Sequence, residues 1–262
     1  MNRKSVMRAL SRVLRNLLHR AGLDLVRYSP LGVTESPKDI DREIVDTITA
    51  VRSFTQTSRE RLISLCDAAR YVVQSGIPGD IVECGVWKGG SMMAVARTLM
   101  AMNDASRELY LFDTFEGMAQ PTDRDVAIDG TTAAQLLRDS SKEDQASVWC
   151  YASLEEVKRA LYSVGYDRTK IHFVKGKVEE TIPANAPANI ALLRLDTDWY
   201  ESTRHELAHL FPRVSRGGVV IIDDYGHWKG AKQAVDEYLR EQKIKLLLNR
   251  VDYTGRIAVK VW

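Results

Sequence analysis

The feature that most constrains the fold is a regular alternation of strand-like and helix-like segments, which begins at Asp80 and continues almost to the end of the chain. Short apolar runs are typical of strands buried in a sheet, whereas longer runs with apolar residues at helical spacing are typical of helices. The predicted strands are 80–84, 108–113, 171–174, 190–196 and 218–223, and the predicted helices are 89–102, 132–138, 153–164, 200–211 and 230–242.

Two further β-rich segments, 244–251 and 256–261, follow the last predicted helix and flank a short turn that contains Gly255. A turn of this length with a glycine is typical of an antiparallel hairpin. Strands that alternate with helices form a parallel sheet with helices on its faces. The sequence therefore predicts an α/β fold, with a doubly wound, mostly parallel sheet that ends in an antiparallel edge.

Composition is that of a globular chain, because 45% of the 262 residues are apolar and 27% are charged. No repeat or low-complexity linker divides the sequence. We predict one catalytic domain, 51–262, and an N-terminal helical extension, 1–50, that serves in dimerisation or as a lid. The cysteines Cys66, Cys84 and Cys150 are widely spaced. This spacing argues against a disulfide framework and a cysteine-bound zinc ion, and favours a reducing cytoplasm.

Positive charge is concentrated at the N-terminus: residues 1–28 carry seven Lys or Arg and one acid, Asp24, so this segment has a net charge of +6. The rest of the chain is therefore mildly acidic, which argues against a nucleic-acid-binding surface. No apolar run is long enough to span a bilayer. A membrane-surface helix and a transit peptide remain alternatives for 1–28. We predict instead that it packs on the body or on the partner of a homodimer, without binding a membrane.

The turn after the first predicted strand, from Glu83 to Ser91, contains glycines at positions 85, 89 and 90. In a doubly wound sheet, ligands bind beyond the carboxyl ends of the strands, beside this first turn. Asp113 ends the second strand, where an acid is placed to accept hydrogen bonds from a ribose diol. Its alternative role is that of a helix cap or loop acid. Together these features favour a nucleoside-containing ligand, although the turn is not a G-x-G-x-x-G dinucleotide motif.

Acidic residues also lie at the ends of two later strands: Asp196 and Asp198 at the end of the fourth, and Asp223 and Asp224 at the end of the fifth. If these strands are parallel neighbours, Asp196, Asp223 and Asp224 converge at one edge of the sheet. Carboxylates that are brought together repel one another, and a divalent cation that prefers oxygen ligands, Mg²⁺ first, would offset the repulsion. Helix capping and solvation are the alternative explanations. His205 and His209 lie four apart on one predicted helix without a third ligand, so we expect no metal there.

Five segments resemble motifs of the macrocin O-methyltransferase family and occur in the same order: 78–90, 112–118, 153–157, 195–198 and 217–225. The resemblance extends over about residues 54–238. It implies a Rossmann-like class I methyltransferase fold, in which a seven-stranded, mostly parallel sheet ends in an antiparallel C-terminal hairpin. It also implies the use of S-adenosylmethionine and Mg²⁺ to methylate a deoxysugar in antibiotic biosynthesis.

The resemblance implies roles for individual residues. Asp196, Asp223 and Asp224 fall on the metal ligands, and Asp196 falls also on the general base. The cofactor-binding residues that it implies are Thr57, Ser58, Glu83, Cys84, Gly85, Val86, Ser91, Asp113, Thr114, Phe115, Gly176, Lys177, Val178 and Asp196. Thr197 and Trp199 depart from the family members that act on macrolides, which have a small residue and a serine in this region, so the acceptor pocket is expected to differ.

A sugar hydroxyl holds its proton tightly, so methyl transfer to it needs a metal ion that lowers its pKa and a carboxylate that takes the proton. Four aromatic residues follow the acidic motifs and are candidates to line the acceptor site: Trp199, Tyr200, His227 and Trp228. The expected acceptor is a small-molecule glycoside. Within the family, the overall length and character of the chain suggest the 4-hydroxyl of noviose in an aminocoumarin.

Proteins with two other functions are built on the same type of sheet. A nicotinamide-dependent oxidoreductase would require the dinucleotide motif and would leave the carboxylates unexplained. A non-catalytic nucleoside-binding protein would have no need for acids at a metal site. We therefore predict a cytoplasmic, metal-dependent O-methyltransferase.

Overall fold

A computed structural model describes residues 39–144 and 147–262, and one compact unit spans Asp41–Trp262. Most of the predicted N-terminal extension, including the basic segment 1–28, lies outside the described residues, so its role stays a prediction. Residues Arg42–Val51 form helix α2 within the compact unit. Among the described residues, no helix combines the length and the apolar character that crossing a membrane requires.

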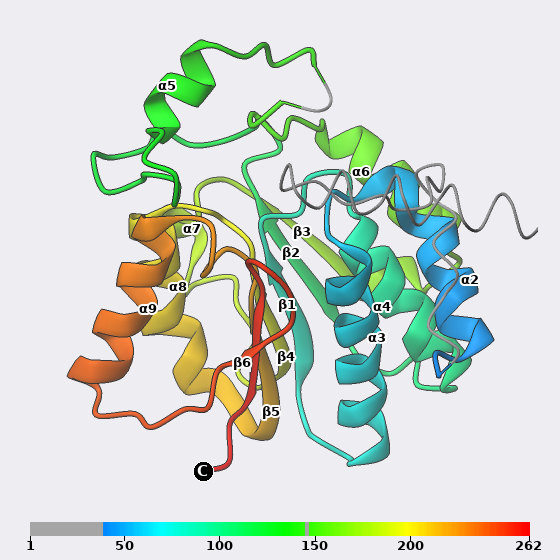
Figure 1. Ribbon diagram of the computed structural model, residues 1–262. Helices are drawn as coiled ribbons and strands as arrows, with labels where there is room; N and C mark the ends of the chain where they lie inside the picture. Colours follow the sequence, from blue (N-terminus) through cyan, green and yellow to red (C-terminus); the bar gives the residue numbers. More distant parts are fainter. Residues whose placement is uncertain (1–38, 145–146) are drawn as a thin grey trace, which may run out of the picture. The chain divides into compact units, whose positions relative to one another are not determined.

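The unit is built on a seven-stranded sheet with the order β3-β2-β1-β4-β5-β7-β6 (Figure 1). Pairing is parallel from β3 to β5 and antiparallel at β7 and β6. The strands are β1 (Asp80–Cys84), β2 (Leu109–Asp113), β3 (Ile171–Lys175), β4 (Ile190–Leu195), β5 (Val214–Ile222), β6 (Asn249–Arg250) and β7 (Arg256–Val259). The predicted fold class is confirmed. The strand order reverses between β1 and β4, which is where such sheets bind their ligands.

Helices cover both faces of the sheet (Figure 1). One face carries α3 (Arg59–Gln74) and α4 (Gly90–Ala101), against which α2 and α6 (Leu154–Ser163) pack. The other face carries α8 (Tyr200–Leu210) and α9 (Lys229–Glu241), which pack on each other, and the short α7 (Val178–Thr181). Short 3-10 helices are Arg52–Phe54, Arg168–Lys170 and Phe211–Arg213. Helix α2 lies, apart from its last residue, within the segment 1–50 that the sequence predicts to be helical, whereas α3 and α7 have no counterpart among the predicted helices.

Burial explains why the central strands read as continuous apolar runs. Every residue of β4 is buried, as are the residues of β5 from Gly218 to Ile222. Between the sheet and α8 and α9, Val82, Leu193, Leu207 and Val235 belong to one apolar cluster. A strand that is covered on both faces has no solvent-facing side on which polar residues would alternate.

The predicted C-terminal hairpin is present but shorter than expected, because β6 contains two residues instead of the whole of 244–251. In the first part of that segment Ile244, Leu246 and Leu248 are partly buried against the apolar cluster, whereas Lys245 and Leu247 are exposed. Alternating burial is the pattern of a strand. In residues 244–248 the alternation results from packing on the core, and pairing with β7 begins only at Asn249.

The segment between β2 and α6 lies beyond the carboxyl ends of the strands and contains the short helix α5 (Ala133–Arg138) that the sequence predicted (Figure 1). It has a small apolar core of its own, in which Ala133 and Leu137 pack with Trp199 and Trp228. The Trp199 indole N–H donates to the carbonyl oxygen of Ala119 at 3.0 Å. The two tryptophans therefore attach this segment to the loops that follow β4 and β5.

Candidate active site

A cavity of about 540 Å³ lies at the carboxyl ends of the parallel strands. Its walls come from the turns that follow β1, β2, β3, β4 and β5 and from the segment that contains α5. Most residues that the sequence singled out are brought together there. They are Thr57, Gly85, Val86, Ser91, Asp113, Thr114, Gly176, Lys177, Val178, Asp196, Trp199, Asp223, Asp224, His227 and Trp228.

Five other candidates, Ser58, Glu83, Cys84, Phe115 and Tyr200, do not line this cavity. The Ser58 hydroxyl caps α3 and donates to Asp252 Oδ2 at 2.6 Å. Cys84 and Phe115 are buried. The Tyr200 hydroxyl donates to a carboxylate oxygen of Glu237 on α9 at 2.7 Å. Glu83 is buried and takes part in the ion pairs described below.

On the β1 side of the cavity, Asp113 joins two turns. Its Oδ2 accepts the backbone N–H groups of Val86 and Trp87 at 2.7 and 3.1 Å, and its Oδ1 accepts that of Phe115 at 2.6 Å. Burial raises the pKa of Asp113, against the effect of these hydrogen bonds. The carboxylate thus holds the glycine-rich turn and the β2 turn in a fixed relation, with its oxygens at the cavity wall.

Gly85 is required by a close approach of two backbones. Its φ is +82°, and a Cβ at this position would lie 2.0 Å from the carbonyl oxygen of Asp196. Only glycine fits such a position without strain. This contact sets the turn after β1 directly against the first residue after β4.

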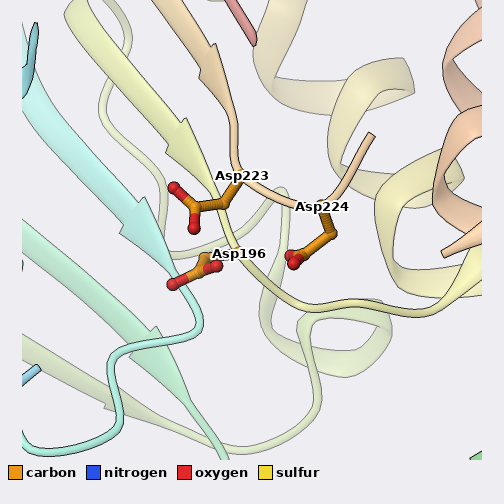
Figure 2. Close-up of side chains that lie close together, drawn as sticks. All are labelled: Asp196, Asp223 and Asp224. Carbon is orange, nitrogen blue, oxygen red and sulfur yellow. The ribbon is translucent and has the colours of Figure 1, made fainter. Parts of the chain in front are cut away.

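Three carboxylates meet where β4 and β5 end, as Figure 2 shows. Asp196 follows β4, and Asp223 and Asp224 follow β5, which is the neighbouring parallel strand. One ligand oxygen from each lies within 4.8 Å of the other two. Burial and neighbouring acids raise the pKa of Asp196, against the effect of Arg194, and raise that of Asp224 as well. The arrangement expected from the strand ends is therefore present.

Two arginines that the sequence analysis missed enter this cluster. Arg194 on β4 is buried, and its Nη1 lies 2.6 Å from Glu83 Oε1 and 2.7 Å from Asp196 Oδ2. Its Nη2 lies 2.8 Å from Asp223 Oδ1. Arg61 on α3 pairs with Asp223 Oδ2 and, through Nε at 3.0 Å, with Asp252. The sequence did contain a signal for Arg194, because it is the lone charge in the apolar run 190–195. It also lies opposite Glu83 in the pairing of β1 with β4.

The two guanidiniums do not neutralise the site. Six carboxylates, those of Glu83, Asp196, Asp198, Asp223, Asp224 and Asp252, belong to this cluster with the two arginines, which leaves an excess of four negative charges when all are ionised. Asp224 Oδ2 is buried without a hydrogen-bond partner among the described residues. Clustered carboxylates with a free buried oxygen are the donor set that Mg²⁺ prefers. The residues present therefore fit a divalent cation.

The opposite side of the cavity is aromatic and apolar. Trp199 and Trp228 meet edge to face at 4.9 Å between ring centroids, and His227 continues the row against Trp228, also at 4.9 Å. Tyr253, which the sequence did not suggest, lies beyond His227 and donates its hydroxyl to His227 Nδ1 or accepts from it at 2.6 Å. Apolar side chains from the segment around α5 complete this wall: Met118, Leu136 and Val148.

The chain was compared with known protein families, curated proteins and solved structures. The family described as "Macrocin-O-methyltransferase (TylF)" matches residues 24–260. A tetracenomycin 4'-O-methyltransferase of Streptomyces olivaceus, named for its 2,3-dimethoxy-rhamnosyl substrate, is 31% identical over 94% of this chain and 88% of its own length. The demethyldecarbamoylnovobiocin O-methyltransferase of Streptomyces niveus is 32% identical over 78% of this chain and 74% of its own length.

Among solved structures, that of the O-methyltransferase NovP is similar with a TM-score of 0.68 and 31% sequence identity, covering 80% of this chain and 83% of the other. The family match covers both ends of the sheet and every residue of the carboxylate cluster. The resemblance inferred from the motifs is thereby confirmed. This chain is an O-methyltransferase and belongs to the macrocin O-methyltransferase family.

Proposed function

We propose that this enzyme transfers the methyl group of S-adenosylmethionine to a deoxysugar hydroxyl of a glycosylated antibiotic precursor, with Mg²⁺ bound in the cavity. The observation that supports this most is the meeting of Asp196, Asp223 and Asp224 in the same cavity as the Gly85 turn and Asp113. The names of the relatives, which include a rhamnosyl tetracenomycin and a mycinamicin methyltransferase, support a sugar acceptor.

For the methyl donor, we assign the part of the cavity beside β1. Methyl transfer from a sulfonium is a displacement in which the cofactor supplies the reactive group and the protein supplies geometry. Gly85 holds the turn after β1 against the Asp196 backbone at the cavity wall, and Asp113 presents a carboxylate to a ribose diol. Thr57, Ser91 and Lys177 also line this cavity and add polar groups to its wall. Glu83 and Cys84 are assigned a supporting role beneath it.

For the metal, we assign Asp196, Asp223 and Asp224 as ligands. When bound, Mg²⁺ would lower the pKa of an acceptor hydroxyl. Asp196 is the proton acceptor in this proposal. Arg194 engages its Oδ2 at 2.7 Å, so the proton would go to Oδ1.

For the acceptor, we assign the aromatic wall formed by Trp199, Trp228, His227 and Tyr253. Aromatic faces pack against the C–H faces of sugars and against flat apolar groups, and the His227–Tyr253 pair supplies polar atoms at the more exposed end. Tyr200, which is bonded to Glu237 outside the cavity, is not part of this assignment. The noviose 4-hydroxyl of an aminocoumarin remains our first candidate acceptor.

Incubation of the native protein with S-adenosylmethionine, Mg²⁺ and a panel of demethyl glycosides tests this function. The panel should contain an aminocoumarin noviosyl, a rhamnosyl tetracenomycin and a macrolide glycoside. Mass spectrometry should show the gain of one methyl group on the sugar of at least one member, and the gain should disappear in EDTA. Replacement of the donor by NAD with no methyl donor present should give no product. Methylation on the aglycone alone, or undiminished methylation in EDTA, would contradict the proposal.

Asp113→Ala is expected to weaken binding of S-adenosylhomocysteine by about 1.5–3 kcal/mol, tenfold or more in the dissociation constant, because hydrogen bonds to a charged group have that magnitude. Titration calorimetry measures the change, and circular dichroism verifies the fold. Asp129→Ala is the matched control, since Asp129 is an exposed acid that does not line the cavity. An unchanged dissociation constant in a folded Asp113→Ala protein would rule out the assignment to the ribose.

We also propose that the enzyme works in the cytoplasm as a homodimer. The three cysteines are all free, which is typical of a reducing compartment. The basic segment 1–28, for which we propose packing on the body or on a partner subunit, lies outside the described residues, and it is the part of the chain on which the dimer proposal depends.

A further inference from the structure

The residues that join β4 to α8 form a tight turn in an unusual conformation. The backbone N–H of Trp199 donates to the carbonyl oxygen of Thr197 at 2.7 Å, and the intervening Asp198 has a φ of +66°. A three-residue turn with positive φ at its centre is rare and strained for a residue other than glycine. Such strain persists only where the surroundings hold the turn. This turn carries Asp198 at its centre and follows directly after Asp196.

One side of this turn is held by the sheet. The Asp196 backbone N–H donates to Cys84 O at 2.9 Å, and Gly85 packs against the Asp196 carbonyl. The other side is held by α8. The Thr197 hydroxyl donates to Glu206 Oε1 at 3.0 Å, and Glu206 is completely buried. Glu206 thus connects the turn to a helix that packs on the sheet and on α9.

Glu206 is an unusual residue for this place, because a carboxyl group is costly to bury unless it is paired or neutral. The side chains that face it are the Thr197 hydroxyl and the Cys84 thiol, and Glu179 and Asp224 are the nearby acids. Burial raises the pKa of Glu206 well above its ordinary value. A neutral carboxyl that accepts from Thr197 is consistent with this environment, and neither the proposed donor site nor the proposed metal site uses it.

We infer that Glu206 is a positioning residue, which acts through Thr197 to hold the strained turn so that Asp196 faces Asp223 and Asp224 at metal-binding separation. This inference rests on the proposed metal site. Functional groups must be held to within about half an ångström by residues that do not themselves touch the ligand. Partners of metal-ligating residues typically change metal affinity by 10- to 100-fold when they are lost.

A double-mutant cycle on the full chain tests the inference, with Mn²⁺ as the probe ion and its free concentration measured by electron paramagnetic resonance. Thr197→Val and Glu206→Leu each remove the hydrogen bond while they keep the size of the side chain. Each is expected to raise the Mn²⁺ dissociation constant at least tenfold. The double variant is expected to be no weaker than the worse single variant, because both changes remove one interaction.

A conservative variant separates positioning from charge. Glu206→Gln keeps an oxygen that accepts from Thr197 and mimics a neutral carboxyl, so its Mn²⁺ affinity should stay within about threefold of the native value, against the tenfold loss expected from removing the interaction. Thr98→Val is the matched control, since Thr98 is a buried threonine on α4 whose hydroxyl bonds to Ala94 O outside the cavity. It should leave Mn²⁺ affinity unchanged.

Native-like affinity in both Thr197→Val and Glu206→Leu, or additive losses in the double variant, would overturn the inference while the metal site stands. If Glu206→Leu does not fold, Thr197→Val decides, because it removes the same hydrogen bond from the other partner. A native protein that binds no Mn²⁺ would instead contradict the proposed metal site, and the inference with it.

Discussion

Replacing Asp196 by asparagine is expected to lower the turnover of the methylated acceptor by roughly 10²–10⁴-fold, the range for loss of a general base. Asparagine keeps the shape and one oxygen for a metal but has no useful basicity. Excess Mg²⁺ should therefore not restore the rate. Initial rates at saturating Mg²⁺, with the dissociation constant of S-adenosylhomocysteine measured alongside, separate a chemical defect from a binding defect.

Asp223→Asn and Asp224→Asn are the comparison variants. Each removes a proposed metal ligand but leaves Asp196, so excess Mg²⁺ is expected to restore part of the turnover. Asp223 also pairs with Arg61 and Arg194, so Asp224→Asn is the cleaner of the two. Nearly normal turnover by Asp196→Asn at saturating Mg²⁺ would show that Asp196 is not the base.

Replacing Arg194 by methionine is expected to destabilise the fold by about 3–5 kcal/mol, the usual cost when one partner of a buried ion pair is removed. Arg194 is 3% exposed, and its guanidinium contacts Glu83, Asp196 and Asp223. Without it, Glu83 and Asp196 lose their paired cation, and Asp223 keeps only Arg61. Urea unfolding in EDTA measures the change. Arg204→Met, which breaks a partly exposed pair with Glu241, should cost less than about 1 kcal/mol.

The loss of stability caused by Arg194→Met should also depend on pH. Burial raises the pKa of Glu83 from its ordinary 4.5 to about 7, against the effect of Arg194. When folding raises the pKa of an acid, its contribution to stability is complete at pH values below its pKa in the unfolded chain. That contribution is lost as the pH rises through its pKa in the folded protein. Removing the guanidinium raises the pKa of Glu83 further. The difference in unfolding free energy between the native protein and Arg194→Met should therefore be larger at pH 8 than at pH 5.5. An equal difference at the two pH values would contradict this explanation.

The sequence predicted the parts of the site that lie at strand ends. Asp113, Asp196 and Asp223 each follow an apolar run, and the carboxyl ends of parallel strands share one edge of the sheet, so their convergence follows from the topology alone. The spacing of apolar residues predicted the strand-helix order, and the turn at Gly255 predicted the antiparallel edge. The apolar pattern of 244–251 did not predict the length of β6, because the residues after α9 alternate in burial by packing on the core instead of pairing with β7.

The ion pairs inside the site could not be predicted in the same way. Arg61 comes from α3, far from Asp223 in sequence, and only the packing of α3 on the sheet brings the two together. The partnership of Thr197 with Glu206 likewise depends on the exact start of α8. The role of Arg194 was easier to predict from the sequence, since Arg194 is the lone charge of a buried strand and pairs in register with Glu83. These arginines offset part of the repulsion among the acids, in addition to any metal ion.

We propose that the carboxylates after β4 and β5 hold a divalent cation in the same cavity as the methyl donor. Crystals of the native protein grown with S-adenosylhomocysteine and Mn²⁺, measured at the manganese absorption edge, test it most directly. We predict one anomalous peak in contact with oxygens of Asp196, Asp223 and Asp224, with the cofactor bound beside Gly85 and Asp113. A map with S-adenosylhomocysteine in place but no peak at these carboxylates would contradict the claim.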